Sequence, residues 1–244
     1  MIHTHHFIHA QIEHKTHVLL FNSKSPDFDS LLMHAREGRA EISKFKCHRT
    51  CNLQTSCNGL ILEYEEPIID NINLYISNPT IGKIHFLPPF VGGVPNLAWG
   101  IAYTSVSMAY KVVLPISTGQ GLEIKFYILI VGVDKSWRAV DLGQMSIEAI
   151  RVFFFPPAIT EGFIHWFHAH SNMVLTLNVE TETVTKTPGP RPSRGIFKHQ
   201  TNIYLSTGKF LSLLLLFGEF SWQVWEMRPE NGEWRKTGSV CLES

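Results

Sequence analysis

The sequence has no surplus of charge of either sign. Its 244 residues include 21 lysines plus arginines and 21 aspartates plus glutamates, so the formal net charge is zero. Binding to phosphate backbones needs clustered surplus cations, so a nucleic-acid-binding protein is not expected. Charged residues make up 17% of the chain and hydrophobic residues 44%. A chain with so few charges and so many apolar side chains supplies a full core, which argues against global disorder.

Long hydrophobic runs and abundant cysteines are also missing. The longest apolar stretch, Phe210–Phe217, is far shorter than the ~20 residues that span a bilayer. The first fifteen residues are rich in histidine and lack the apolar segment of a secretory signal. Four cysteines do not make a disulfide scaffold for this length. We therefore expect no membrane partner and a reducing compartment, the cytoplasm or the nucleus.

Motifs of catalysis are absent as well. The chain has no G-x-S-x-G elbow, no H-E-x-x-H pair and no glycine-rich phosphate loop. We therefore expect a protein that is not an enzyme, with no catalytic residues, no cofactor and no bound metal.

What recurs instead are short apolar or alternating runs between turn residues. They are rich in Val, Ile, Leu, Phe and Tyr and rarely exceed eight residues, which favours strands. Helical periodicity is confined to two short candidates, Asp27–Glu37 and Met145–Val152. The sequence therefore predicts an all-β fold with strands at Val18–Phe21, Leu60–Tyr64, Leu74–Ser77, Tyr110–Leu114, Phe126–Val131, Val174–Val179 and Leu211–Phe217.

Four times, an apolar strand runs into a polar turn and then into a second strand. The turn markers Asn78, Asp134, Glu180 and Pro229 are separated by 56, 46 and 49 residues. Kelch-type propeller blades repeat at about 50 residues, and each blade is a four-stranded antiparallel sheet. The spacing favours a β-propeller-like fold over an antiparallel sandwich. We expect the residue after the turn, tryptophan at Trp137 and Trp234, to face the neighbouring blade.

The predicted organisation is a polar, histidine-rich tail over residues 1–15, followed by one propeller-like domain over residues 16–244. A weaker first unit lies at Val18–Pro26, about one repeat before Asn78. A closed propeller joins its first and last strands, which removes the sheet edges. The sequence leaves two alternatives open, closure through N-terminal strands or an incomplete ring.

A series of short motifs runs along the chain between its turns. They lie at Ser56–Leu60, Ser77–Lys83, Leu87–Pro89, Trp99–Tyr103, Tyr110–Val113, Ser136–Arg138, Gly162–Trp166, Val224–Met227 and Glu233–Trp234. No single motif is diagnostic, but in this order they resemble one known family, the plant F-box-associated domain. That family's pattern reads roughly S-C-N-G-L, then N-P-T-T-G and L-P, with later Y-K-V-V, S-W-R, G-x-x-H-W, V-W-x-M and E-W elements.

The resemblance implies a role in protein recognition. Full-length members carry an N-terminal F-box that docks on a Skp-type adaptor of an SCF ubiquitin ligase, and the associated domain captures the protein to be ubiquitinated. This sequence departs from the pattern because only about fifteen polar residues precede the domain, so no F-box is expected. The leading expectation is a non-catalytic, substrate-recruiting module that reaches SCF components through a partner. The alternatives are an F-box-less decoy without ligase contact and a glycosidase-like propeller enzyme.

Several residues invite sharper chemical interpretations. Cys47, Cys51 and Cys57 have part of a zinc-site spacing, but the distant second ligand pair of a structural zinc site is missing. The cluster His3, His5, His6, His9, His14 and His17 favours adventitious metal capture in a tail. His165 belongs to the G-x-x-H-W motif, and we expect a structural role for it. Strand alternation would place the neighbouring His168 and His170 on one face, as candidate ligands or bases.

The remaining candidates are carboxylates and loops. Glu63, Glu65, Glu66 and Asp70 could pair for glycosidase-like chemistry, but they are more typical of a solvated acidic turn. Gly92-Gly93 is typical of an inter-blade turn. The connection Thr187–Gln200 contains Arg191 and Arg194, and arginine is enriched at interface hot spots. A flexible inter-blade linker explains this connection better than a binding loop does, so no partner-binding residues are assigned.

Overall fold

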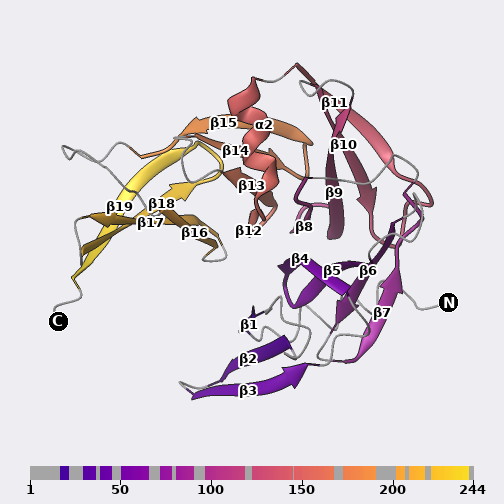
Figure 1. Cartoon of the computed structure of the whole chain (residues 1–244), viewed down its shortest axis with the longest axis horizontal. Coiled ribbons are helices and arrows are strands. Elements are labelled where there is room, and N and C mark those ends of the chain that lie inside the picture. Colours follow the sequence, from indigo (N-terminus) through magenta and orange to yellow (C-terminus); the bar gives the residue numbers. More distant parts are fainter. Residues whose placement is uncertain are drawn as a thin grey trace. The chain divides into compact units, whose positions relative to one another are not determined.

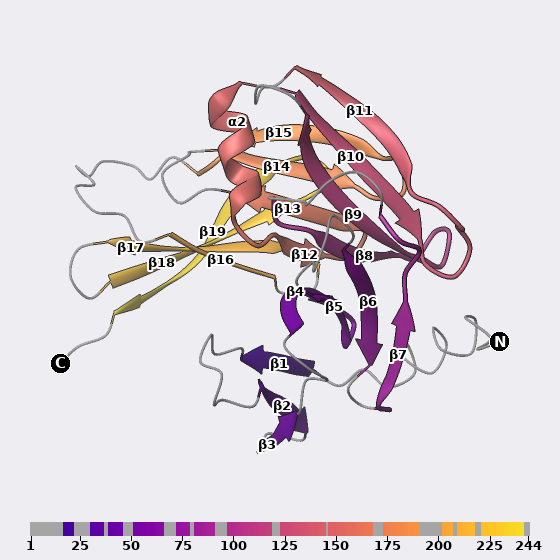
Figure 2. The same ribbon diagram turned by 45° about the vertical axis from the view of Figure 1, so that its right-hand side comes forward.

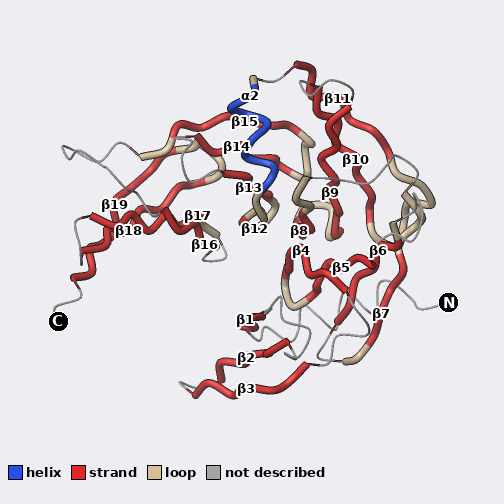
Figure 3. Tube along the Cα trace, in the orientation of Figure 1, coloured by secondary structure: helices blue, strands red, loops and turns tan. Residues whose placement is uncertain are grey.

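Strands account for most of the described chain. The computed structural model describes residues 17–21, 30–36, 39–45, 51–65, 72–78, 81–90, 97–118, 123–144, 146–167, 173–190, 202–206, 209–217 and 221–241. Within these ranges the only helical elements are α2 (Ile147–Arg151) and the adjoining 3₁₀ turn η1 (Val152–Phe154), as Figure 3 shows. The prediction of an all-β fold is confirmed.

The strands form five antiparallel sheets. The first sheet has three strands: β1 (His17–Phe21), β2 (Ser30–Arg36) and β3 (Arg39–Phe45). The second contains β4 (Cys51–Cys57), β5 (Leu60–Glu65), β6 (Asn73–Asn78) and β7 (Lys83–Phe86). The third contains β8 (Gly100–Thr104), β9 (Ala109–Thr118), β10 (Glu123–Ile130) and β11 (Arg138–Gln144). The fourth contains β12 (Ala158–Thr160), β13 (Phe163–Phe167), β14 (Met173–Asn178) and β15 (Thr183–Pro188). The fifth contains β16 (Asn202–Ser206), β17 (Leu211–Phe217), β18 (Ser221–Arg228) and β19 (Glu233–Cys241).

Each four-stranded sheet is an up-and-down meander, because the strands lie side by side in their order along the sequence. This is the sheet from which propeller blades are built. The four predicted turn hairpins are the last two strands of the four sheets, β6–β7, β10–β11, β14–β15 and β18–β19. The predicted four-stranded antiparallel units are therefore confirmed, and the weaker first unit is a three-stranded sheet in the described part of the chain.

The two helix candidates have opposite outcomes. The Met145–Val152 prediction is confirmed by α2, whose N-cap Ser146 accepts a hydrogen bond from the backbone of Ala149. The Asp27–Glu37 prediction is wrong, because Ser30–Arg36 is strand β2 and pairs with β1 and β3 on both sides. Leu, Met, Ala and Arg rank among the better helix formers, but helix propensity is a small energy per residue that tertiary contacts override, and here the pairing within a sheet does so.

Two compact units divide the chain, and each is described by itself. The first comprises Met1–Val94 and Leu129–Trp137, and the second comprises Pro95–Ile128 and Arg138–Ser244. The first unit contains the sheets β1–β3 and β4–β7 and the turn between β10 and β11. Its apolar side chains are buried along β5 and β6, where Leu60, Leu62, Leu74 and Ile76 have almost no exposure. Asn58 and Gly59, with φ of 49° and 78°, form the tight turn from β4 to β5 that an Asn-Gly pair favours.

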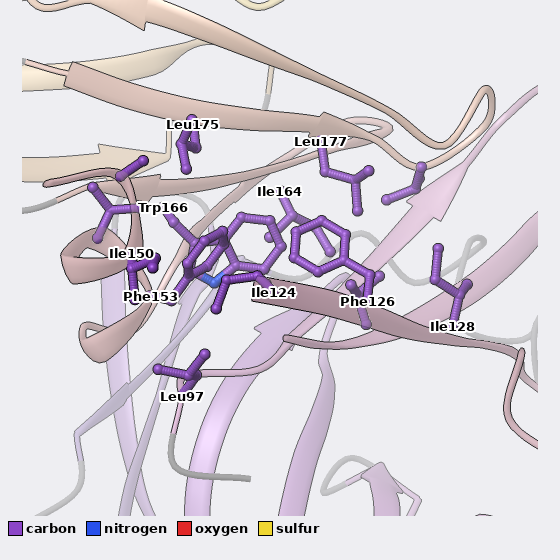
Figure 4. Close-up of a cluster of buried hydrophobic side chains, with 14 of the residues drawn as sticks. Leu97, Ile124, Phe126, Ile128, Ile150, Phe153, Ile164, Trp166, Leu175 and Leu177 are labelled. Atoms are coloured by element: carbon purple, nitrogen blue, oxygen red, sulfur yellow. The ribbon is translucent and has the colours of Figure 1, made fainter. Parts of the chain in front are cut away.

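The second unit has a core between the β8–β11 sheet and the β12–β15 sheet. Figure 4 shows its aromatic centre, where Phe126, Phe153 and Trp166 pack with ring centroids 5.2 to 5.7 Å apart. The Trp166 indole also donates a 2.9 Å hydrogen bond to the carbonyl of Ala98. Isoleucine, leucine and valine side chains from both sheets and from α2 surround the three rings. Because these rings are fully buried, this cluster is a main source of the unit's stability.

A second cluster joins the last two sheets. Val174 on β14 packs with Leu211, Leu213 and Leu215 on β17 and with Met227 on β18. Figures 1 and 2 show the β12 end of one sheet beside β16 of the next. No helix in the described ranges is long and apolar enough to cross a membrane.

Candidate functional site

Among the histidines that the structure describes, His165 is the most deeply buried. It lies on β13 and is fully buried, with Thr160 Oγ1 2.8 Å from its Nε2 and Thr176 Oγ1 2.9 Å from its Nδ1. Burial lowers the pKa of His165 to about 3. The ring is therefore neutral at physiological pH and has both nitrogens engaged. This arrangement fits the expected structural role of His165, whereas a general base needs a pKa near the operating pH and access to a substrate.

Glu63 is the described carboxylate that is most deeply buried. Its side chain on β5 accepts a hydrogen bond from the hydroxyl of Ser77 on β6. Glu65, two residues further along the same strand, is partly exposed and accepts a 3.3 Å hydrogen bond from the Asn73 side chain. Glu66 and Asp70 lie outside the described residues. The interpretation of these carboxylates as a solvated acidic turn is therefore wrong for Glu63 and Glu65, because both lie on a strand whose pairing fixes their positions, and Glu63 is buried.

A polar network links the turn before β15 to β8, β9 and β11. The Glu182 carboxylate accepts hydrogen bonds of 2.6 and 2.7 Å from the Arg138 guanidinium. It also forms an ion pair with Lys111 Nζ at 3.0 Å. The side chain of Lys111 is only 7% exposed, so this pair is largely desolvated. Arg138 and Lys111 hold the pKa of the Glu182 carboxyl below its usual range.

Glu180 completes this network, which we call the Glu180–Glu182 network. Its carboxylate accepts hydrogen bonds from Thr104 Oγ1 at 2.6 Å and from Ser107 Oγ at 2.8 Å. These two hydroxyls, with the charge of Lys111, lower the pKa of Glu180. Hydrogen bonds from these two hydroxyls to one carboxylate therefore fasten the β8–β9 turn to the β14–β15 turn.

Glu182 occupies a backbone conformation that normally selects glycine. Its φ is 58°, and Gly82 and Gly232, the corresponding residues of two other hairpin turns, have φ of 63° and 70°. The amides of Glu182 and Gly232 each donate to the carbonyl four residues earlier, at 2.8 Å. A non-glycine residue in this region costs about 1–2 kcal/mol. The ion pairs with Lys111 and Arg138 give a reason for glutamate at this position.

The two post-turn tryptophans make the same contact. Trp137 Nε1 donates a 2.8 Å hydrogen bond to the carbonyl of Pro88, and Trp234 Nε1 donates a 2.9 Å bond to the carbonyl of Pro188. Each proline lies at or just after the last strand of the preceding sheet. Trp137 also packs edge-to-face on Phe90, with ring centroids 5.8 Å apart. The expectation that these residues face the neighbouring blade is confirmed.

Other sequence candidates lie largely outside the described residues. Cys57 lies half-buried on β4. The described residues hold no group of three or more His, Cys, Asp or Glu side chains placed for a metal ion. The zinc interpretation and the loop interpretation therefore stay untested, since the undescribed positions include Cys47, His168, His170, Gly92, Gly93, Arg191, Arg194 and the histidines of the tail.

Sequence reasoning missed the exposed apolar side chains. Val106 and Met108, in the β8–β9 turn, are 78% and 61% exposed, and Phe154 and Phe155, at the end of η1, are 54% and 43% exposed. Two sequence signals could have predicted them. Val106 and Met108 are apolar residues in a turn, where polar residues are usual. Three phenylalanines follow directly after the predicted helix. The Glu180–Glu182 network was also missed, because its partners are 44 to 76 residues apart in sequence.

No protein-family model matches the sequence, and no curated protein sequence matches it. Solved structures do match. TolB from Acinetobacter baumannii is 12% identical with a TM-score of 0.49, covering 91% of this chain and 51% of TolB. A prolyl endopeptidase is 9% identical with a TM-score of 0.45, covering 98% of this chain and 39% of the endopeptidase. The SapL1 lectin, solved with alpha methyl fucoside, is 11% identical with a TM-score of 0.43, covering 93% of this chain and 83% of the lectin.

This chain spans about half the length of TolB and about two fifths of the endopeptidase. The matched proteins contain β-propellers and differ in their activities, so the likeness concerns the fold alone. The fold is therefore assigned from the four-stranded meanders of this chain. The chain has an all-β, propeller-like fold built from four-stranded antiparallel sheets.

Proposed function

We propose that the chain is a non-catalytic protein-recognition module, similar to the plant F-box-associated domain, that recruits a protein substrate to an SCF ubiquitin ligase. The repeated tryptophan contact carries the proposal. Trp137 belongs to the S-W-R motif, Trp234 to the E-W pair and Pro88 to the L-P motif, and the two indoles bind equivalent carbonyls. Motifs that share one structural role along the chain support a common architecture with that family.

Other motif residues of the resemblance also have defined positions. Gly162 begins the G-x-x-H-W motif with φ of 77°, a conformation that glycine favours, and its amide donates to the carbonyl of Tyr103. His165 and Trp166 of the same motif are fully buried. Asn58-Gly59 of S-C-N-G-L makes a tight hairpin turn. These motif residues stabilise the architecture. We therefore expect the loops and the outward-facing side chains to determine which partner is bound.

The surface features of the second unit favour binding over chemistry. His165 is neutral and enclosed, and the Glu180–Glu182 network has its carboxylates engaged by hydroxyls, lysine and arginine. The large apolar side chains of this unit that are exposed, Val106, Met108, Phe154 and Phe155, lie instead in connections between strands. Aromatic residues and methionine are enriched at protein interfaces. We expect ligase contact to run through an F-box provided by another segment or a partner chain.

Affinity purification of the tagged chain from plant cell extract tests this proposal. Mass spectrometry is expected to find a Skp-type adaptor and a cullin enriched over a tag-only control. Recovery of another enriched protein without either ligase subunit would support a recognition module of the decoy type and contradict the recruiting role. Enrichment of chaperones alone would contradict both.

A further inference from the structure

The β16–β19 sheet, the last sheet of the second unit, buries its two faces unequally. Leu213 and Leu215 on β17 pack in the cluster with Val174, and they are 1% and 5% exposed. Because side chains alternate along a strand, Leu214 lies on the opposite face, and it is only partly buried. On β14 of the preceding sheet, Val174 and Leu175 are both buried although they lie on opposite faces. We call the less covered face, which carries Leu214, the outer face of the β16–β19 sheet.

The pairing of the strands fixes which residues share this outer face. Leu214 pairs with Val224, and Val224 pairs with Gly238, so these three residues form one row across β17, β18 and β19. Val224 is only partly buried. A Cβ atom built on Gly238 would meet no atom within 4 Å. The row is therefore apolar, and the space over its glycine is open.

Charged residues form two further rows at one end of the outer face. Glu226 pairs with Arg235, and Arg228 pairs with Glu233. The sign of the charge therefore alternates along each strand and also between the two strands. Arg228, Glu233 and Arg235 are exposed, and Glu226 is partly buried. These four charges sum to zero, as the formal charge of the whole chain does, so two copies have no net repulsion at this face.

This pattern is complementary to itself under a two-fold rotation. An axis that runs along the strands, midway between β18 and β19, exchanges the two strands and keeps the height of each residue along them. Glu226 of one copy then lies opposite Arg235 of the other, and Arg228 lies opposite Glu233. In the next row, Val224 of one copy lies over Gly238 of the other, where a side chain is missing. A symmetric dimer requires one patch that matches itself in this way.

We propose that two copies of this chain associate through the outer face of the β16–β19 sheet, with β18 of each copy packed over β19 of the other. These strands have eight and nine residues. At ~4.8 Å between strands and ~3.4 Å per residue, the two strands cover roughly 250–300 Å² per copy. This area is at the low end for specific interfaces, so the dimer is weak and reversible. The inference goes beyond the proposed recognition function and does not rest on it.

Sedimentation velocity of the intact chain, from ~1 µM to ~1 mM, tests the proposal. The wild type is expected to shift from monomer towards dimer as the concentration rises. Gly238 has no positive φ, so G238R introduces no backbone strain. We expect G238R to weaken association roughly tenfold or more, because the new side chain occupies the space that Val224 of the other copy enters.

S239R is the matched control for G238R. Ser239 is the next residue of β19 and is exposed, but it pairs with Gln223 and lies on the opposite face. The two variants have the same added charge and the same added side chain. We expect S239R to associate as the wild type does, and thermal unfolding is expected to show that both variants are folded.

Charge reversal tests which residues meet across the interface. E226R places guanidinium groups opposite each other and R235E places carboxylates opposite each other, so each variant alone is expected to associate severalfold more weakly than the wild type. An equimolar mixture of E226R and R235E is expected to regain association, because every guanidinium then meets a carboxylate of the other copy. A loss of folding in either variant would not produce this recovery.

The inference is overturned if the wild type stays monomeric over the whole range, if G238R and S239R associate equally well, or if the mixture of E226R and R235E associates no better than either variant alone. A monomer whose thermal stability falls in G238R but not in S239R also overturns it, and would show that another part of the same chain covers this face. The recruiting role is tested separately by the recovery of adaptor and cullin, so either proposal can fail without the other.

Discussion

Gly100 lies on β8 where that strand passes closest to β13. A Cβ atom at this position would lie 2.8 Å from Cγ2 and 2.9 Å from Cδ1 of Ile164, which is fully buried. We expect Gly100→Ala to destabilise the protein by about 1–3 kcal/mol, because overpacking forces the neighbouring side chain to move. Urea unfolding of the intact chain measures this loss.

The reason for that loss is checked by a double-mutant cycle. Ile164→Ala removes Cγ2, Cδ1 and Cγ1 of Ile164, the three atoms nearest to the new methyl group, so G100A is expected to be much less harmful in the I164A background. Additive losses in the cycle would assign the effect of G100A to backbone conformation instead of crowding.

His165 predicts a specific dependence of stability on pH. Its pKa is about 3 in the folded protein and about 6.5 in an unfolded chain. As pH falls below about 6.5 the unfolded state takes up the proton first, so the free energy of unfolding decreases until the folded state also protonates near pH 3. The stabilisation from a neutral His165 is thus present above pH 6.5 and lost on acidification.

The measurement compares wild type with H165Q, which does not titrate. The difference in free energy of unfolding between the two is expected to change by up to ~1.4 kcal/mol per pH unit between about pH 6 and pH 4, to the disadvantage of the wild type. Parallel pH profiles for the two proteins would show that His165 is solvated or charged in the native state.

At the scale of elements, the β14–β15 turn combines an unfavourable backbone conformation with a favourable ion pair. We expect Glu182→Ala to destabilise the protein by about 1–3 kcal/mol, because Lys111 then remains largely buried without its carboxylate partner. Glu182→Gly is expected to be less harmful by about 1 kcal/mol, since glycine adopts a φ of 58° without strain.

The matched control is the double variant K111M/E182G, in which both charges and the strain are removed together. Its stability is expected to lie close to that of the wild type, because an apolar side chain replaces the buried cation. If K111M/E182G is less stable than E182G alone, then Lys111 contributes through contacts other than its pairing with Glu182.

Trp137 and Trp234 each follow a hairpin turn. Each of them connects that turn to the end of the last strand of the preceding sheet. Trp137→Phe and Trp234→Phe keep an aromatic ring but remove the indole donor to Pro88 and Pro188. Each substitution is expected to cost about 0.5–1.5 kcal/mol in thermal or urea unfolding. Trp222→Phe on β18, which touches neither contact, is the control, and an equal loss there would exclude the indole bond as the cause.

Much of the element order follows from local patterns, whereas the polar contacts do not. Asn58-Gly59 and Asn78 specify turns through their own chemistry, and the short apolar runs between them favour strands over helices at this length. Ser146, directly before helix α2, is an N-cap residue that can be recognised in the sequence. The partners of Glu182 could not be predicted, because Lys111 and Arg138 reach it only after two sheets have packed. Strand β2 was likewise settled by pairing, against the weak helix preference of Leu31–Arg36.

For the molecule as a whole, the gradient of burial across each sheet predicts a gradient of local stability. In the second unit, β9 and β14 are buried along nearly their full length, whereas the last strands β15 and β19 are largely exposed. Amide hydrogen exchange is therefore expected to be slowest on β9 and β14 and clearly faster on β15 and β19. Uniform protection of all four strands would instead indicate that each sheet opens only by global unfolding.

The tryptophan contacts have a consequence for how such chains diverge and grow. Their acceptor is a main-chain carbonyl, which every amino acid possesses, so only the donor side of the contact is constrained in sequence. A duplicated gene segment that encodes the β8–β11 sheet or the β16–β19 sheet would bring its own indole and would find an acceptor at the end of whichever strand precedes it. The number of repeats can then change by copying or deletion without inventing a new junction, while the loops diverge freely.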